Sequence, residues 1–234
     1  MKIDVLTLFP EQFGILSGGI IGKAIKEKRF EVNVVNIRDF SPDKRRRCDD
    51  APFGGGSGMV MTPQPVRDAI GAADPSHEAL RIYMSPCGAV LTQEKVKKLA
   101  EREPKRLLLL CGSYEGVDRR VIDLDTDEEI SIGDYILTSG ELPALVLINA
   151  VARYIPGVLG NSESLTEESF SDGLLEYPQY TRPRVFGGIS VPETLLNGNH
   201  KEIAEFRRAR QLEITRRNRK DLYRKYLKKT GDKS

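Results

Sequence analysis

A run of five apolar residues at positions 107–111 most constrains what this chain can fold into. No polar side chain interrupts the run, and the turn-forming residues Pro104 and Gly112 lie on either side of it. A strand that is apolar at every position must be buried on both faces, which happens where helices cover both sides of a parallel sheet. The run therefore predicts a central strand of an α/β domain.

The order of the other segments favours the same fold class, because strands that alternate with helices are typical of a mostly parallel sheet. The final helix of the series is apolar nearly all round, so we expect it to be buried or to lie at a subunit interface. Together with 107–111, the patterns predict strands at 3–9, 32–37 and 80–84 and helices at 11–27, 65–73, 92–103 and 142–154.

Three glycine-bearing loops follow predicted strands, beginning at Ser85, at Gly112 and near Gly133. In open α/β sheets, ligands bind at the carboxyl ends of the strands. We therefore expect the three loops to converge on one ligand site.

The third of these loops, residues 131–143, combines backbone freedom with hydrogen-bonding groups and a helix start. Gly133 and Gly140 can adopt positive φ or let a ligand touch the backbone. Residues 135–137 are short and apolar and are expected to end a buried strand, while Pro143 suits the first turn of a helix. A tight turn between strand and helix would explain the same composition.

A second glycine run, at 52–59, does not match a nucleotide-binding fingerprint. Met59 stands where glycine or alanine would be needed, and no Gly-Lys-Ser/Thr follows. What remains is an amide-rich loop beside Asp49, Asp50 and the basic residues 44–47. Such a loop can wrap a phosphate or a flipped base, and it can equally be a surface loop without a ligand.

Charge is concentrated at the C-terminal end although the formal net charge is only +2. Residues 201–229 contain twelve Lys or Arg against four Asp or Glu, which favours contact with phosphates over a merely solvated helix face. The stretch before it is polar, with no Lys or Arg between Arg153 and Arg182. We expect an α/β domain at 1–160, a linker at 161–173 and a basic helical domain at 174–234.

The remaining composition argues against several classes. Three scattered cysteines make no disulfide framework, and with only two histidines they make no metal-ligand cluster. The acidic residues at 123–129 are interpreted as a solvated loop rather than a metal site. No apolar run reaches membrane-spanning length and no cleavable signal is present, so a cytoplasmic protein is expected.

Ordered motifs along nearly the whole chain carry a family resemblance. They lie at residues 8–10, 38–40, 49–50, 52–59, 85–86, 111–112, 114–116, 127–129, 131–135, 140–143, 155–160, 180–183 and 198–200. With these segments the chain resembles the bacterial tRNA (guanine-N1)-methyltransferases of the SPOUT class.

The resemblance implies an α/β domain that ends in a trefoil knot, a homodimer with active sites shared between subunits, and S-adenosylmethionine as methyl donor. The implied substrate is tRNA, methylated at N1 of the guanosine immediately 3′ of the anticodon. The residues implied for the donor are Tyr83, Met84, Ser85, Pro86, Gly112, Tyr114, Glu115, Gly116, Ser131, Ile132, Gly133, Asp134, Tyr135, Ile136, Leu137, Gly140 and Pro143.

The implied chemistry needs a base, because guanine N1 carries a proton at neutral pH. The family places an aspartate there; Glu168 stands at that position in this chain, with Glu167 as the alternative, and Arg153 would stabilise the charge that develops on guanine. The residues implied for the tRNA and its target base are Asp50, Gly54, Gly55, Gly56, Gly58, Lys44 and Arg45.

The chain departs from the family at two further positions: Ser113, where Arg or His is frequent, and Ser139, where Gly is common. Two other hypotheses are a catalytically silent RNA-binding relative and a methyltransferase for ribosomal RNA. Retention of Tyr114, Glu115 and Arg153 favours an enzyme, and the C-terminal motifs favour tRNA. The sequence names no protein ligands for Mg²⁺, which could enter with substrate phosphates or bind carboxylates.

Overall fold

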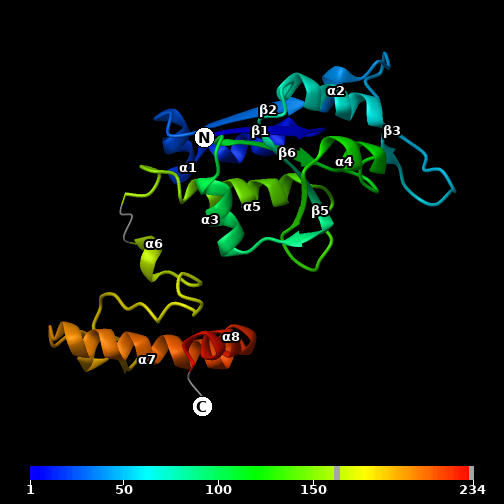
Figure 1. Ribbon diagram of the computed structural model, residues 1–234. Helices are drawn as coiled ribbons and strands as arrows, with labels where there is room; N and C mark the ends of the chain where they lie inside the picture. Colours follow the sequence, from blue (N-terminus) through cyan, green and yellow to red (C-terminus); the bar gives the residue numbers. More distant parts are fainter. Residues whose placement is uncertain (161–163, 232–234) are drawn as a thin grey trace. The chain divides into compact units, whose positions relative to one another are not determined.

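The computed structural model describes residues 1–160 and 164–231. The chain divides into two compact units, Met1–Gly160 and Asn161–Ser234 (Figure 1). Within the described residues, no helix combines the length and apolarity needed to cross a membrane.

A five-stranded sheet forms the centre of the first unit, with the strand order β2-β1-β6-β5-β7. Every neighbouring pair in this sheet is parallel, which confirms the predicted mostly parallel α/β fold. Its strands are β1 (Lys2–Thr7), β2 (Glu31–Asn36), β5 (Leu80–Val90), β6 (Arg106–Cys111) and β7 (Glu128–Ser131).

Helices cover both faces of the sheet: α1, α3 and α5 lie on one side and α2 and α4 on the other (Figure 1). A small antiparallel hairpin, β3 with β4, projects from the same unit. The remaining elements of this unit are η1 (Pro10–Ser17), α1 (Gly19–Lys26), η2 (Ile37–Phe40), β3 (Asp49–Asp50), β4 (Val60–Met61), α2 (Pro63–Ala73), α3 (Gln93–Glu101), α4 (Arg119–Asp125) and α5 (Glu141–Ala152).

The apolar run at 107–111 is the central strand β6, as predicted. Leu107 and Leu109 pack into the core with α1, α3 and α5, whereas Leu108 and Leu110 pack into the core with α2 and α4. All four side chains are fully buried. The strand therefore supplies apolar side chains to two cores at once, which explains why no position in it is polar.

The strand end predicted at 135–137 is wrong. Tyr135, Ile136 and Leu137 lie in a loop with 55%, 79% and 37% of their surface exposed. The strand is β7, which ends at Ser131 and carries Glu128 and Glu129, two acids interpreted above as part of a solvated loop.

The edge position of β7 accommodates these acids because cations from elsewhere neutralise them. Lys95 of α3 forms an ion pair with Glu128, and Arg119 of α4 forms one with Glu129 at 2.6 Å. Asp123 and Asp125, also assigned to a loop, belong to α4.

Two predicted elements differ in detail. The helix expected at 11–27 is divided into η1 and α1, because Gly18 is extended and Gly19 adopts φ +59°. The strand expected at 80–84 continues to Val90 after a bulge, in which Met84 and Ala89 both pair with Ile130. Pro86 lies inside the bulge, where its missing N–H interrupts no ladder bond.

The second unit is built around two helices, α7 and α8. Among the described helical residues of this unit, Thr215 of α7 is the one that is buried. The Thr215 hydroxyl accepts a hydrogen bond from the Leu175 N–H at 2.9 Å. The described elements of this unit are α6 (Ser164–Glu167), β8 (Val185–Phe186), β9 (Ile189–Ser190), η3 (Glu193–Leu195), α7 (His200–Asn218) and α8 (Lys220–Thr230).

Candidate functional site

A cavity of about 420 Å³ lies at the carboxyl ends of β5, β6 and β7. Its walls come from the β5 bulge, the loop after β6 and the loop between β7 and α5. These are the three glycine-bearing loops of the sequence. The structure brings every residue predicted for the methyl donor into the lining of this one cavity, except the exposed Asp134.

Close backbone contact fixes the crossing of the second and third loops. The Gly140 N–H donates to the Gly112 carbonyl at 2.8 Å, and Ser113 pairs with Ser139 in an antiparallel bridge. A Cβ on Gly140 would lie 2.8 Å from the Cys111 Cα, closer than real Cβ atoms approach. Glycine is therefore required here by space rather than by φ, which is −81°.

The β5 bulge packs against its neighbour β7 with equally close backbone contact. A Cβ on Gly88 would lie 2.3 Å from the backbone carbonyl carbon of Glu129. Gly116, in the loop after β6, is required for a different reason, because its φ of +111° is strained for any other residue. Direct contact between backbones therefore sets the shape of the cavity wall.

Two tyrosines shape the cavity on the β6 side. Tyr83 is 9% exposed and packs against Gly112 and Gly116, and burial raises the pKa of its phenol, so it stays neutral at physiological pH. Tyr114 adopts φ +59°, which costs a non-glycine residue roughly 1–2 kcal/mol. Ser139, in contrast, is not in the left-handed region despite replacing the family's glycine.

The glycine loop at 52–59 is the tip of the β3–β4 hairpin, and its base adjoins the cavity. The Glu115 N–H donates to the Met59 carbonyl at 2.9 Å, and the Met61 N–H donates to the Gly116 carbonyl at 2.9 Å. Gly58 packs so closely against Glu115 that a Cβ would lie 2.5 Å from its carboxylate oxygen. Gly58, predicted for the target base, thus lies beside Glu115, predicted for the donor.

The tip of this loop is open. Gly54, Gly55 and Gly56 all adopt positive φ, and nothing lies within 4 Å of a Cβ on any of them. Phe53 is fully exposed beside them. Asp50, at the start of the loop, accepts a hydrogen bond from the Ala51 N–H at 2.8 Å.

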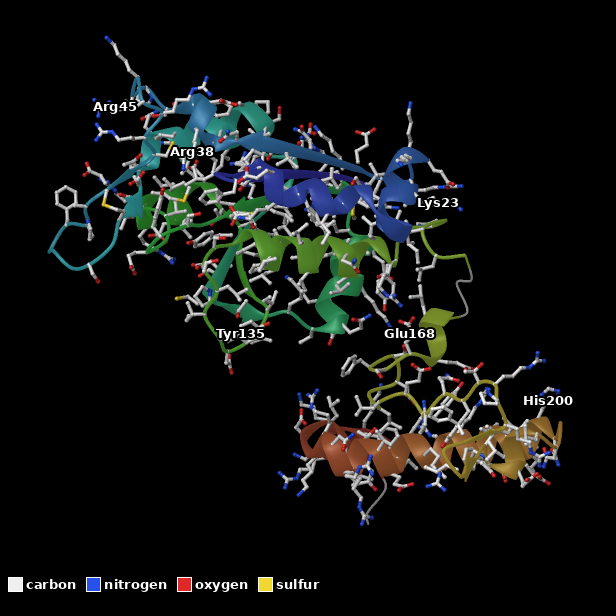
Figure 2. The ribbon with its side chains drawn as sticks, turned by 180° about the vertical axis from the view of Figure 1, so that it is seen from behind. Lys23, Arg38, Arg45, Tyr135, Glu168 and His200 are labelled. Atoms are coloured by element: carbon white, nitrogen blue, oxygen red, sulfur yellow. The ribbon has the colours of Figure 1, made fainter. Side chains whose placement is uncertain are left out.

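The basic residues before the hairpin divide into two pairs. Arg46 pairs with Asp39 and Arg47 with Asp43, each at 2.9 Å. Within residues 1–160 and 164–231, the predicted phosphate ligands Lys44 and Arg45 have no ion-pair partner. The Arg45 side chain extends outward from the chain (Figure 2).

Arg153, predicted to be catalytic, belongs to the same unit as this cavity but does not line it. Gly140 caps the start of α5 at the cavity, whereas half-buried Arg153 caps its other end. Twelve helical residues lie between them, so the two caps are about 20 Å apart along the helix. Glu168 follows α6 in the second unit and is half-buried (Figure 2). Its neighbour Glu167 accepts a hydrogen bond from the Tyr177 hydroxyl at 2.7 Å.

The sequence patterns missed several lining residues. Most are chain neighbours of predicted ones and could have been found by that signal alone, but Arg119 and Ile122 come from α4, for which nothing in the sequence indicated a role. The full set is Cys87, Ser113, Val117, Arg119, Ile122, Glu129, Ile130, Thr138 and Ser139. Across the described chain, no three His, Cys, Asp or Glu side chains gather at metal-binding spacing.

Comparison with known proteins assigns the family. The model of the family described as tRNA (Guanine-1)-methyltransferase TrmD matches residues 1–225. Three relatives carry the name tRNA (guanine-N(1)-)-methyltransferase. The one from Ruminiclostridium cellulolyticum is 56% identical over 96% of this chain and 97% of its own. The one from Caldanaerobacter subterraneus subsp. tengcongensis is 55% identical over 96% of this chain and 92% of its own. The one from Clostridioides difficile is 51% identical over 96% of this chain and 98% of its own. The chain belongs to the tRNA (guanine-1)-methyltransferase TrmD family.

Proposed function

We propose that this protein transfers a methyl group from S-adenosylmethionine to N1 of guanine in tRNA, at the guanosine immediately 3′ of the anticodon. The observation that carries the proposal is the convergence of three strand-end loops on one cavity in a chain of this family. The names of the relatives support the same reaction.

The cavity suits the methyl donor. Its volume of about 420 Å³ falls in the usual range for small-molecule sites, roughly 300–1,000 Å³. Ile132, Ile136 and Leu137 offer apolar contact for a purine ring, and Glu115 offers negative charge to a cationic ligand. The donor, when bound, supplies an electrophilic methyl group on a positively charged sulfur.

The hairpin loop at 52–59 would receive the target guanine. A base inside RNA can reach an enzyme's reacting groups only after it leaves the stack. Gly58 lies against Glu115 at the cavity, and the open backbone of Gly54, Gly55 and Gly56 leaves room for a flipped base. Asp50 and the cations Lys44 and Arg45 would then contact the nucleotide and its phosphates.

Glu168 would remove the N1 proton as the methyl group arrives, and Arg153 would stabilise the negative charge left on the guanine ring. Because Arg153 lies about 15 Å along α5 from Pro143, the last residue of that helix to line its own cavity, we infer that it acts at the cavity of a second copy. A homodimer is supported by α5 itself. Its apolar residues Leu142 and Val146, four positions apart on one face, are 51% and 47% exposed.

The second unit would hold the tRNA backbone. A groove of about 860 Å³ on α7 and α8 is lined by Arg216, Arg217, Lys220 and Arg224. Cations of this density bind RNA phosphates. We take 174–234 as the tRNA-binding domain and 161–173 as its connection; residues 161–163 and 232–234 lie outside the described part of the chain. An enzyme with this substrate would act in the bacterial cytoplasm.

We further propose that the first unit ends in the trefoil knot of the SPOUT class. The tight crossings support it: the Gly88 backbone lies against Glu129, and Gly140 lies against Cys111. Loops that cross in direct backbone contact are what a knotted chain requires. Connections of this kind are rare, so the proposal rests on the family as well as on these contacts.

The test is methyl transfer from labelled S-adenosylmethionine to an unmodified tRNA transcript, with the methylated base located afterwards. We expect N1-methylguanosine beside the anticodon with the wild type and with Glu168→Asp, and loss of the product with Glu168→Ala. A transcript with adenosine at that position is the control. If only Glu167→Ala loses the product, Glu167 rather than Glu168 is the general base. If the wild type binds the donor and tRNA but transfers no methyl group, the protein is a catalytically silent relative.

Mixed dimers test whether Arg153 acts across subunits. One chain would carry Arg153→Ala and the other Gly133→Val, which blocks the cavity; each variant alone should be inactive. If Arg153 serves the partner's cavity, the mixed dimer has one complete site and about half the wild-type activity. If Arg153 serves its own cavity, both sites of the mixed dimer are incomplete and no activity returns.

A further inference from the structure

A second cavity, of about 460 Å³, lies entirely within the second unit. Aromatic and aliphatic side chains line it together with arginines, a combination that suits a nucleobase and its phosphate better than it suits a purely apolar ligand. The residues that carry the argument are Tyr177, Tyr180, Arg182, Leu196 and Arg207. Nothing in the proposed reaction uses this cavity.

Tyr177 forms a fixed wall of the cavity. Its side chain is 9% exposed, and the Arg207 guanidinium lies over its ring, 4.7 Å from the ring centre. Its hydroxyl donates to Glu167 at 2.7 Å. With one face covered by a cation and its hydroxyl already bonded, this ring is held in place.

Tyr180 is different, because its ring is available. It is 46% exposed, and no cation of the described chain lies over it. Leu196, also at the cavity, is 47% exposed. An accessible aromatic face beside an apolar side chain is a stacking platform for one base.

The cavity also carries unneutralised positive charge. Arg184 is paired with Glu193 at 2.6 Å, and Arg207 approaches Glu167 at 3.9 Å. Exposed Arg182 has no ion-pair partner among the residues that the structure describes. The Arg182 guanidinium can therefore form an ion pair with an anionic group of a ligand.

We propose that this cavity binds one unstacked nucleotide of the tRNA, with its base on Tyr180 and its phosphate at Arg182. The inference rests on the proposed function, since it assumes that RNA is the substrate. A concave site of about 460 Å³ admits a base that has left its helix, whereas a paired base cannot enter it. The protein then binds the tRNA at a second unpaired nucleotide, in addition to the target guanosine.

The test uses the full-length protein, a tRNA transcript, and steady-state methylation together with equilibrium binding. Tyr180→Ala should raise KM and Kd for tRNA about 5- to 150-fold, the range for loss of one base–aromatic stack, and leave kcat within about twofold. Tyr180→Phe keeps the ring and should restore both constants. Phe186→Ala is the matched control, because Phe186 is 79% exposed in the same unit but does not line the cavity.

Arg182→Gln separates the phosphate contact from the stack. It should weaken tRNA binding and reduce the slope of log Kd against log salt by about 1, the amount expected for the loss of one phosphate contact. Photo-crosslinking with a 4-thiouridine-substituted transcript should join Tyr180 to a nucleotide that is unpaired in tRNA.

Three results would overturn the proposal: unchanged KM in Tyr180→Ala, an equal loss in Phe186→Ala, or a crosslink to a base-paired nucleotide. A Tyr180→Ala protein that loses its dimeric state instead of tRNA affinity would assign the cavity to an interface between copies. If the wild type methylates no tRNA, the proposed function fails first; if it methylates normally and Tyr180→Ala does too, only the second site fails.

Discussion

Gly140 is the point at which the predicted effect of one methyl group can be worked out most directly. Its φ and ψ of −81° and −6° are ordinary, so alanine could adopt the conformation. The obstacle is space: a Cβ would lie 2.8 Å from the Cys111 Cα and 2.9 Å from the Gly112 nitrogen. Carbon atoms pack best at about 3.5–4.0 Å, so the backbones would have to separate by about 1 Å.

This separation has two costs. Overpacking a well-packed site costs roughly 1–3 kcal/mol. The hydrogen bond from Gly140 to Gly112, 2.8 Å long, is stretched as the loops part, and a bond of this kind is worth about 1 kcal/mol. We expect Gly140→Ala to lower the free energy of unfolding by about 2–4 kcal/mol. Because both loops line the cavity, we also expect at least tenfold weaker binding of S-adenosylhomocysteine.

Urea denaturation followed by far-UV circular dichroism measures the first effect, since the chain has no Trp for fluorescence, and calorimetry measures the second. Gly71→Ala is the matched control. Gly71 lies in α2 with nothing within 4 Å of its Cβ position, so alanine there should stabilise by about 0.5–1 kcal/mol. A Gly140→Ala protein with wild-type stability and wild-type ligand affinity would refute the reasoning.

Three further predictions concern other parts of the first unit. Burial opposes ionisation of Asp74, but the Arg81 hydrogen bond and backbone N–H groups outweigh it and hold the pKa below its ordinary value. Asp74→Asn should therefore cost about 3–5 kcal/mol at pH 7, and the difference from wild type should shrink as pH falls below about 4, in urea titrations over a pH series. In native protein a thiol reagent should modify Cys87, which is exposed at the cavity, much faster than the other two cysteines, whose pKa values burial raises; S-adenosylhomocysteine should slow this modification. Phe53→Ala should leave stability within about 0.5 kcal/mol and raise KM for tRNA without changing S-adenosylhomocysteine affinity, and an unchanged KM would exclude Phe53 from tRNA contact.

The central sheet could be predicted from sequence because burial on both faces requires an apolar side chain at every position of a strand. The run at 107–111 is apolar throughout, and its alternate side chains enter two different cores. Residues 135–137 were misassigned because apolar side chains that line a cavity have the same composition as side chains in a core. Only the structure reveals that Ile136 is 79% exposed.

The acidic strand β7 shows a second limit of prediction from local sequence patterns. Glu128 and Glu129 are neutralised by Lys95 and Arg119, which lie 33 and ten positions away in the chain. A pattern that considers neighbouring residues cannot register a counter-charge supplied by another helix. The same limit applies to the cavity, where α4 contributes residues that no local motif indicated.

The glycines show how far a sequence can go toward a site. A glycine can be required by its φ, as at Gly116, or by the close approach of another backbone, as at Gly88 and Gly140. The sequence marks all three identically, but the two causes have different consequences. A φ requirement fixes one residue, whereas a close approach fixes two segments relative to each other. Since both tight crossings hold loops to strands of the sheet or their immediate ends, the cavity inherits the rigidity of the sheet. A site preorganised in this way loses little entropy when a flexible ligand binds.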